Sequence, residues 1–270
     1  MPELPEVEIT RLALCEHILD RTITAVTVRN KQLRWPVPPL LGRKLPGERI
    51  TAIDRRGKYL LFTSSAGCFI VHLGMSGSLC IVDAGRQAGK HDHVDIDFDD
   101  MVMRYNDPRR FGSFHWAGSQ PLAHRLLQDL GPEPLSAGFD GDYLYQQSRK
   151  RKVAVKAFIM DHHTVVGVGN IYANEALFQA GIHPRRAAGR ISVERYRLLA
   201  GAIKAVLRKA IAAGGTTLKD FVSGAHKPGY FQLQLAVYAR EGLPCPRCRA
   251  PLRHTVLGQR ASFYCINCQR

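Results

Sequence analysis

GKYLLFTSSAGCFIVHLGMSGSLCIV, residues 57–82, is the stretch that decides the fold of the first half of this 270-residue chain. It contains three short runs rich in leucine, aromatic and β-branched side chains, at residues 58–63, 68–73 and 78–82. Glycines mark the turns around these runs, namely Gly57, Gly67, Gly74 and Gly77. Short apolar runs bounded by such turns are typical of β-strands. The stretch therefore predicts three consecutive strands.

The same pattern extends outward in both directions. Residues 22–28 are β-branched and alternating, and residues 93–98 and 101–105 form two further runs on either side of Asp99-Asp100. A helix is expected over residues 5–19, ahead of all the strands. Many short strands joined by tight turns predict a β-sandwich.

The second half of the chain has a different periodicity. Residues 131–136, GPEPLS, have the composition of a linker, and beyond them apolar side chains recur at helical spacing. Helices are predicted at residues 140–148, 153–161, 170–180 and 192–212. Residues 214–230 contain too many glycines and polar residues for a regular element, so a long loop is expected there.

The charge is as unevenly distributed as the periodicity. The net charge is +15, but residues 1–144 carry 17 Lys and Arg against 18 Asp and Glu, whereas residues 145–270 carry 21 against 5. A local excess of this kind indicates a surface for a polyanion, with nucleic acid as the first candidate. Composition alone leaves open a ribosome-associated or merely solubilising charge.

The chain contains no segment suited to a membrane or to secretion. Its longest apolar runs fall far short of the ~20 residues that a membrane span requires. Acidic residues and prolines occupy the place of a signal peptide. We therefore expect a cytoplasmic, soluble protein, in which the scattered cysteines are ordinary buried side chains. These are Cys15, Cys68 and Cys80.

Four further cysteines are clustered at the C-terminus in two Cys-x-x-Cys pairs sixteen residues apart, namely Cys245, Cys248, Cys265 and Cys268. This spacing predicts a zinc ribbon, because two such pairs complete the tetrahedron that a structural zinc prefers. With all four positions filled by protein, one structural zinc ion is expected, and it holds a hairpin too small to fold on its own core. A redox dithiol pair is the competing interpretation.

The N-terminus, Met1-Pro2-Glu3, carries a second candidate site. If Met1 is removed, Pro2 becomes a secondary amine with a pKa near ~8, and Glu3 supplies a carboxylate beside it. Such an amine can form a permanently charged iminium with a carbonyl carbon, which favours elimination at the neighbouring carbon. From these residues alone the favoured interpretation is the start of a helix, with Pro5 in its first turn and Glu6 and Glu8 at the positive end of its dipole.

Several motifs together resemble the formamidopyrimidine-DNA glycosylase family along the whole chain. They are MPELPEVE at 1–8, GKYL at 57–60, HLGMSG at 72–77, DPRRFG at 107–112, GVGNIY at 167–172, and the four cysteines. The resemblance implies an α+β protein: an N-terminal helix with a β-sandwich, a helical domain with a helix-two-turns-helix motif, and the zinc ribbon. The predicted domains are residues 1–130, a linker at 131–139, the helical DNA-binding domain at 140–235 with a lesion-capping loop at 214–230, and the zinc finger at 236–270.

The resemblance also implies the reaction. The enzyme would excise oxidised purines, chiefly 8-oxoguanine opposite cytosine and formamidopyrimidines, from duplex DNA and then cleave the strand by β- and δ-elimination. Pro2 would be the nucleophile, Glu3 the proton donor to the opening sugar, and Lys58 the proton donor in β-elimination. By the resemblance Arg260 would have the corresponding role in δ-elimination, although a guanidinium with a pKa above ~12 is better suited to holding a phosphate. The implied cofactor is zinc alone, with no organic cofactor.

Other residues correspond to DNA-contacting positions of the family. Met75, Arg110 and Phe111 match the trio that enters the duplex where the base has left. The remaining matches to DNA-contacting positions are His91, Arg151, Lys152 and Asn170. The matches to the base pocket are Glu6, Thr217, Lys219 and Tyr230. The expected partner is damaged double-stranded DNA, bound by a monomer that associates with the nucleoid.

Two rival functions remain. One is an endonuclease VIII-like glycosylase for oxidised pyrimidines, against which Leu4, Met75 and the pair Arg110-Phe111 argue. The other is a zinc-ribbon DNA-binding protein that has lost catalysis, against which the presence of Pro2, Glu3 and Lys58 argues.

Overall fold

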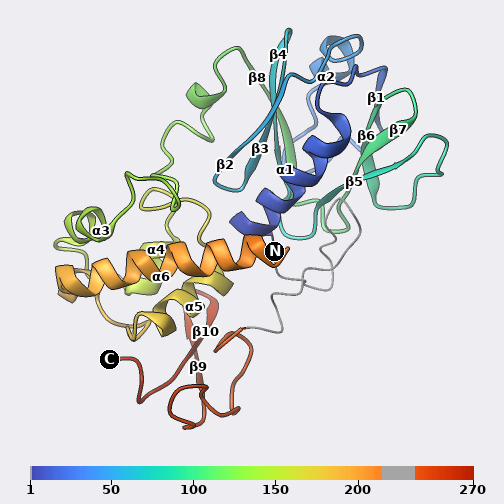
Figure 1. Cartoon of the computed structure of the whole chain (residues 1–270). Helices are drawn as coiled ribbons and strands as arrows, with labels where there is room; N and C mark the ends of the chain where they lie inside the picture. The colour runs from blue at the N-terminus through green and yellow to red at the C-terminus, as the bar shows by residue number, and fades with distance from the viewer. Residues whose placement is uncertain (1, 215–234) are drawn as a thin grey trace. The chain divides into compact units, whose positions relative to one another are not determined.

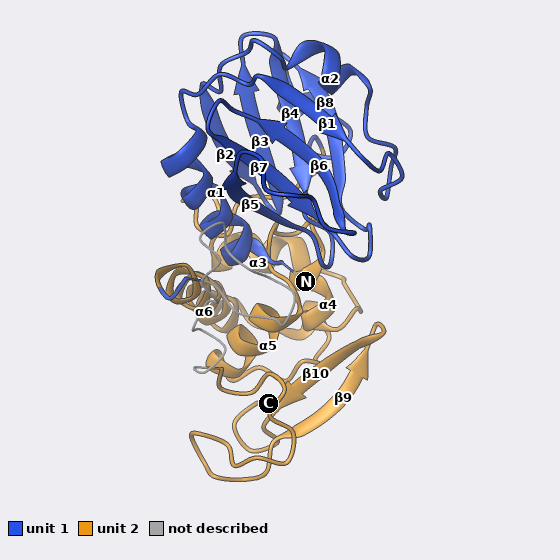
Figure 2. Ribbon diagram, turned by 90° about the vertical axis from the view of Figure 1, so that its right-hand side faces the viewer, with its two compact units in different colours: residues 1–128, 213–232 blue, residues 129–212, 233–270 orange. Residues whose placement is uncertain are grey.

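The computed structural model describes residues 2–214 and 235–270. The chain divides into two compact units, residues 1–128 with 213–232, and residues 129–212 with 233–270 (Figure 2). The predicted loop at 214–230 falls almost wholly outside the described residues, and Thr217, Lys219 and Tyr230 lie outside them as well.

The first unit contains two four-stranded antiparallel sheets and an N-terminal helix (Figure 1). One sheet has the order β1-β6-β7-β5 and the other has the order β2-β3-β4-β8. The helices are α1 (Leu4–Ile18) and α2 (Leu40–Lys44), and the strands are β1 (Ala25–Val28), β2 (Ala52–Arg56), β3 (Tyr59–Ser64), β4 (Gly67–His72), β5 (Ser78–Asp83), β6 (Asp92–Asp97), β7 (Met101–Asn106) and β8 (Ser113–Gly118).

Both sheets and α1 contribute to a single apolar core. Leu14 of α1, Phe69 of β4 and Ile96 of β6 belong to the same buried cluster. Phe62 pairs with Phe69 across the β3–β4 hairpin, and their rings stack with centroids 4.6 Å apart. The predicted sandwich and the predicted N-terminal helix are therefore confirmed.

Two strands were not predicted from the sequence. β2 contains Asp54, Arg55 and Arg56, and β8 contains His115 and Trp116, so neither has the apolar alternation of a typical strand. Each pairs with a strongly apolar neighbour, β2 with β3 and β8 with β4. Their strand conformation is therefore set by backbone pairing, which local sequence patterns do not report.

The second unit is helical and ends in a hairpin. Its elements are the helices α3 (Gly141–Ser148), α4 (Val155–Met160), α5 (Asn170–Gln179) and α6 (Val193–Ala212), and the strands β9 (Arg253–Leu257) and β10 (Arg260–Tyr264), with short 3-10 turns at Pro121–Ala123 in the first unit and Ala188–Arg190 in the second. The four predicted helices are confirmed within a few residues. In α6 the buried side chains Tyr196, Leu199, Ile203 and Leu207 recur at helical spacing.

Within the described ranges, none of the helices has the length and apolar character needed to cross a lipid bilayer.

Candidate functional site

The first turn of α1 fixes the N-terminal residues. Pro2 is buried, and Glu3 and Glu6 are each only 2% exposed. The backbone N–H of Glu3 donates to Oε2 of Glu6 at 2.9 Å, and the Thr10 hydroxyl donates to the Glu6 carbonyl at the same distance. The helix start predicted as the alternative role of these residues therefore exists. It holds the peptide bond between Pro2 and Glu3 in one orientation.

The turn that carries Lys58 is tied to the same helix. Gly57 and Lys58 connect β2 to β3, and Gly57 has a φ of +59°. The guanidinium of Arg55 donates to the Gly57 carbonyl at 2.9 Å and to Oε2 of Glu8 at 2.7 Å. Because Glu8 lies on α1, one arginine links the helix that begins at Glu3 to the turn that carries Lys58.

The charge of Glu8 is stabilised in this network. Burial alone would raise the pKa of Glu8, but hydrogen bonds from Arg11 and Arg55, at 2.7 Å each, outweigh the desolvation and lower it. A lowered pKa means that the stabilisation is complete above the unfolded pKa of ~4.3 and is lost as the pH falls through the folded value.

Glu8→Gln is therefore expected to lower the free energy of unfolding by about 1–3 kcal/mol at neutral pH. The difference from the unsubstituted chain should shrink as the pH falls below ~4, where Glu8 itself is protonated. Urea unfolding at a series of pH values measures this difference, with Glu16→Gln on the exposed face of α1 as the matched control. A difference that did not depend on pH would show that the charge of Glu8 is not what stabilises the network.

Two loops of the first unit meet at one buried carboxylate. Asp107 is fully buried and accepts hydrogen bonds from the Ser76 hydroxyl at 2.6 Å, the Tyr105 hydroxyl at 2.9 Å and the Gly112 amide at 2.9 Å. Ser76 belongs to the loop between β4 and β5, and Gly112 to the loop between β7 and β8. Gly74 has a φ of +68°, and a Cβ there would lie 2.4 Å from the backbone of the other loop, so only glycine fits. The two loops are therefore held together rigidly at Asp107, and we call this contact the loop junction.

Exposed side chains project from this loop junction. Met75 is 38% exposed and Phe111 43%, so two large apolar side chains face solvent on adjoining loops. Arg110 is also exposed and has a φ of +58°, and the guanidinium of Arg109 lies 4.9 Å from the centre of the Phe111 ring. His91 adjoins the same loop junction, since its carbonyl accepts the amide of Asp107 at 2.9 Å. The structure thus brings together Met75, His91, Arg110 and Phe111.

A cavity of about 740 Å³ opens beside these loops. His72 lines it, and its Nδ1 accepts the Gly74 amide at 3.1 Å, which leaves Nε2 to carry the proton. Burial, reinforced by the charges of Lys58 and Arg34, lowers the pKa of His72 to about 3. His72 is therefore a neutral imidazole with a fixed N–H donor. The remaining lining residues are Gln32, Leu33, Arg34, Gly74, Met75, Arg109, Arg110 and Phe111.

In the second unit, helix α5 begins at Asn170 after Gly169. The side-chain Oδ1 of Asn170 is buried and has no hydrogen-bond partner within the described part of the chain. Backbone amides at a helix start favour anions, and the side-chain amide of Asn170 adds a further donor. This end of α5 therefore has the chemistry of a phosphate site.

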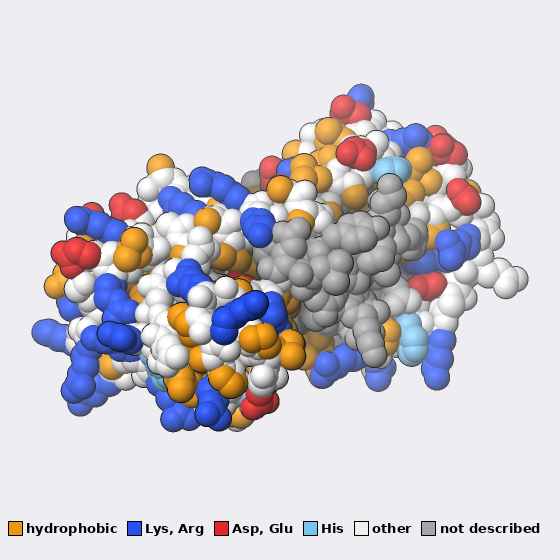
Figure 3. Space-filling view, turned by 60° about the horizontal axis from the view of Figure 1, so that its bottom comes forward, with side chains coloured by type: hydrophobic (Ala, Val, Ile, Leu, Met, Phe, Trp, Pro, Cys, Tyr) orange, Lys and Arg blue, Asp and Glu red, His pale blue; other side chains and the backbone are white. Residues whose placement is uncertain are grey.

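The other predicted cations of the second unit are exposed. Arg151 and Lys152 follow Lys150, which has a φ of +63° and turns the chain after α3. Arg260 is exposed at the start of β10. In Figure 3 the lower part of Figure 1 comes forward. Many Lys and Arg side chains lie on the left-hand side of this view, with few acidic side chains among them.

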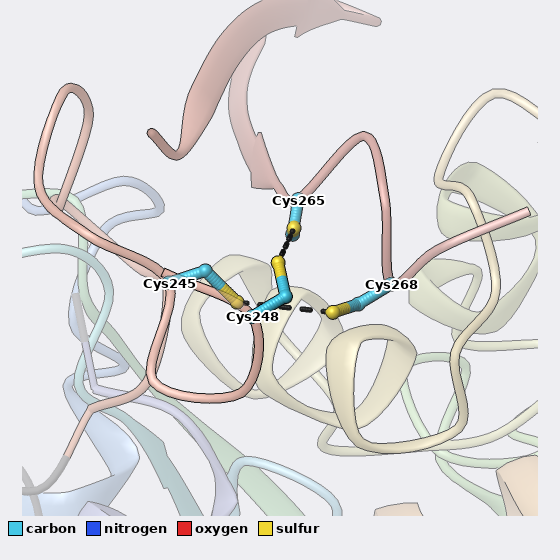
Figure 4. Close-up of side chains that lie close together, drawn as sticks. All are labelled: Cys245, Cys248, Cys265 and Cys268. Atoms are coloured by element: carbon cyan, nitrogen blue, oxygen red, sulfur yellow. Dashed lines mark hydrogen bonds between the residues drawn. The ribbon is translucent and has the colours of Figure 1, made fainter. Parts of the chain in front are cut away.

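The four C-terminal cysteines converge from two turns (Figure 4). The sulfur atoms of Cys245 and Cys268 are 3.9 Å apart, and those of Cys248 and Cys265 are 3.4 Å apart. A tetrahedral zinc with Zn–S bonds of ~2.3 Å requires sulfur atoms ~3.8 Å apart. The thiol set therefore fits one structural zinc ion.

The structure adds buried and half-buried polar residues that were not assigned from the sequence. His72 lies inside the quoted HLGMSG motif, so the motif was a signal for it. Glu175 on α5 accepts the backbone amides of residues 236–238 at 2.8–2.9 Å and thereby anchors the segment that leads into the zinc hairpin. Asp107 opens the DPRRFG motif, but its role was not assigned from the sequence, because its bond to Ser76 joins two separate loops. Glu175 could not be singled out, because its partners lie about 60 residues further along the chain.

Three family models match the chain. They describe the formamidopyrimidine-DNA glycosylase N-terminal domain at residues 1–114, the formamidopyrimidine-DNA glycosylase H2TH domain at residues 130–222, and a zinc finger found in FPG and IleRS at residues 242–270.

Individual proteins match over the full length. Proteins named formamidopyrimidine-DNA glycosylase from Alkalilimnicola ehrlichii and Stutzerimonas stutzeri are 55% and 57% identical, with both chains covered completely. Among solved structures, MutM (FPG) from Thermus thermophilus is 36% identical with a TM-score of 0.90, covering 99% of this chain and 98% of that chain. A MutM complex with DNA containing carbocyclic 8-oxo-G is 32% identical with a TM-score of 0.91, and both chains are covered completely. Lactococcus lactis Fpg bound to DNA with an abasic site is 31% identical with the same TM-score, covering 99% of each chain.

Proposed function

Since the chain belongs to the formamidopyrimidine-DNA glycosylase family, we propose that it is a base excision repair glycosylase and abasic-site lyase acting on oxidised purines in duplex DNA. The observation that carries this proposal is the match, over the full length of both chains, to relatives named formamidopyrimidine-DNA glycosylase. Pro2 and Glu3 stand at the start of α1 in this chain. The proposed substrates are 8-oxoguanine opposite cytosine and formamidopyrimidines.

The proposed reaction begins with extrusion of the damaged nucleotide, because a stacked base shields its sugar carbon from a nucleophile. The lone pair of the Pro2 nitrogen attacks C1′, and the bond from C1′ to the base breaks. The amine loses its proton as it bonds to C1′, and the departing base takes up one proton in balance. Glu3 gives a proton to the opening sugar oxygen. The product is a positively charged iminium between Pro2 and C1′.

Strand cleavage follows from the iminium. Its positive charge acidifies C2′, and loss of the C2′ proton expels the 3′ phosphate in β-elimination. Loss of the C4′ proton then expels the 5′ phosphate in δ-elimination. We assign Lys58 to proton transfer in β-elimination. Arg260 holds and stabilises the departing phosphate, since an arginine side chain binds phosphate bidentately and gives up protons poorly.

The exposed tips of the two joined loops suit the opening left in the duplex. Met75 and Phe111 would enter the stack as apolar wedges, and Arg110 would hydrogen-bond the orphan cytosine. The rigid loop junction around Asp107 supports this role, because an inserted side chain separates stacked base pairs only if the loop that carries it does not move. His91, Arg151, Lys152 and Asn170 are proposed contacts to the DNA backbone.

Glu6 is the one proposed base-pocket residue among those described. Its carboxylate accepts the Glu3 amide, which supports a role in holding the N-terminus as well. The domain boundaries predicted from the sequence, the monomeric state, and a cytoplasmic location with association to the nucleoid also stand as proposals.

Single-turnover kinetics test the proposed function directly. We expect duplexes with 8-oxoguanine opposite cytosine to be cleaved at least about tenfold faster than the same sequence with an oxidised pyrimidine, since a pocket with hydrogen-bonding groups rejects a base that leaves them unpaired. 8-Oxoguanine opposite adenine is the matched control for recognition of the orphan base. Faster cleavage of the oxidised pyrimidine would favour the endonuclease VIII-like alternative, and no cleavage of any lesion would favour the DNA-binding protein without catalysis.

A further inference from the structure

Hairpin β9–β10 carries Arg260 as the first residue of β10, and the three residues that follow are held by side chains of the helices. Lys156 on α4 is 1% exposed, and its ammonium donates to the Ala261 carbonyl at 2.6 Å and to the Ser262 hydroxyl at 2.7 Å. Asn174 on α5, also 1% exposed, accepts the Phe263 amide at 2.8 Å.

The second hydrogen bond of Asn174 leads to a different proposed DNA contact. Its side-chain Nδ2 donates to the Asn170 carbonyl at 2.7 Å, one helical turn earlier on α5. The orientation of this amide is determined by its partners: the Phe263 amide can only donate, and the Asn170 carbonyl can only accept. One buried side chain therefore connects the start of α5 to the strand that begins at Arg260.

We propose that Asn174 is a positioning residue, which fixes Arg260 relative to Asn170. The guanidinium of Arg260 and the start of α5 then contact phosphates of the DNA backbone at a fixed distance from each other. This inference rests on the proposed function, which makes both residues phosphate contacts. A phosphate held at the start of α5 defines where the strand lies, and a guanidinium acts on a departing phosphate only within hydrogen-bond reach.

The hairpin has other attachments, so Asn174 is not needed merely to keep it folded. The four cysteines fit a zinc ion, and Gln269 links the Cys265 amide to the Ile182 carbonyl with two bonds of 2.9 Å. Glu175 accepts backbone amides of the segment that leads into the hairpin, and Lys156 donates to β10 independently of Asn174. Loss of the Asn174 bonds should therefore change the position of β10 more than its existence.

The test compares Asn174→Leu, which removes both hydrogen bonds, with Asn174→Asp, which keeps the acceptor for Phe263 but cannot donate to Asn170. Gln147→Leu on the exposed face of α3 is the matched control. Each full-length protein, with its zinc content measured, is given a duplex with a single abasic site. The ratio of δ-elimination to β-elimination product is then measured, together with the yield of the borohydride-trapped adduct.

For Asn174→Leu we expect the ratio of δ-elimination to β-elimination product to fall by about five- to tenfold, because Arg260 acts on the second departing phosphate. The yield of the borohydride-trapped adduct should fall less. Asn174→Asp should show a smaller fall, and Gln147→Leu none. A purely structural role would lower both readouts in proportion. An unchanged ratio, or a proportional loss, in both Asn174 variants would overturn the proposal.

A second measurement separates this inference from the proposed function. Binding to a duplex with an uncleavable abasic analogue is followed as a function of salt, since each lost phosphate contact lowers the slope of log K against log[salt] by ~1. If the unsubstituted chain forms no adduct, the proposed function fails, and the slope alone then decides. A smaller slope in Asn174→Leu supports positioning, and an identical slope refutes it. If Asn174→Leu loses zinc, Asn174→Asp is decisive for both readouts.

Discussion

Retention of Met1 is expected to abolish covalent trapping of the chain on DNA containing 8-oxoguanine. A peptide nitrogen has no free lone pair, so Pro2 can attack C1′ only when its amine is free. The borohydride adduct should therefore fall by about 10³-fold or more, as expected for loss of a catalytic nucleophile. The yield of adduct on a gel measures this, for protein whose N-terminus has been established by mass spectrometry.

Two controls make the experiment specific. Pro2→Gly with Met1 removed keeps a primary terminal amine and should retain part of the lyase activity. The Met1-retaining chain should still bind the damaged duplex, since its basic surface is unchanged. Undiminished trapping with Met1 retained would rule out the terminal amine as the nucleophile, and the burial of Pro2 would then have only a structural meaning.

Removal of zinc is expected to have the second large effect. The C-terminal segment packs around a small core, in which Phe178 of α5 joins Val237, Leu252 and two of the cysteines themselves. Strands β9 and β10 are five residues each, and such a hairpin is at best marginally stable without a further constraint. Metal binding in a site of this kind supplies the folding free energy, so the hairpin should unfold when the metal is removed.

Loss of the hairpin should weaken binding to duplex DNA by on the order of 10²-fold at moderate salt, because several arginines lose their fixed positions together. Cys265→Ser and treatment with a chelator should both have this effect, and added Zn²⁺ should reverse the second. Cys15→Ala, a cysteine outside the cluster, is the matched control. Full affinity in a chain shown to lack zinc would mean that the hairpin folds by itself or contributes nothing to binding.

Local pattern was sufficient for most of the elements. The strands at residues 58–63, 68–73 and 78–82 and the helix over 192–212 were predicted because their side chains alternate or recur with the period of the element. β2 and β8 were missed because their side chains are charged or polar and their conformation comes from pairing with β3 and β4. β8 pairs with a strand that is distant in the sequence, which no local pattern reports. β2 pairs with β3 across the tight turn at Gly57-Lys58, and its charged side chains conceal the strand.

The candidate site divides in the same way. Pro2, Glu3 and Lys58 came from motifs, and the cysteines from their spacing. The groups that hold such residues in place were not assigned from the sequence: Asp107 lies in a motif but its role there was not recognised, and Asn174 lies outside the motifs.

The sequence by itself therefore determined the residue types that carry the chemistry: an amine beside a carboxylate, four thiols at zinc spacing, and a basic second half. Only the tertiary structure decided how those residues are held. Asp107 joins two loops through Ser76, Arg55 ties the Lys58 turn to α1, and Asn174 connects Asn170 to β10. The physical reason is that a buried polar group is stable only when its hydrogen bonds are satisfied, and the partners that satisfy it are chosen by the fold.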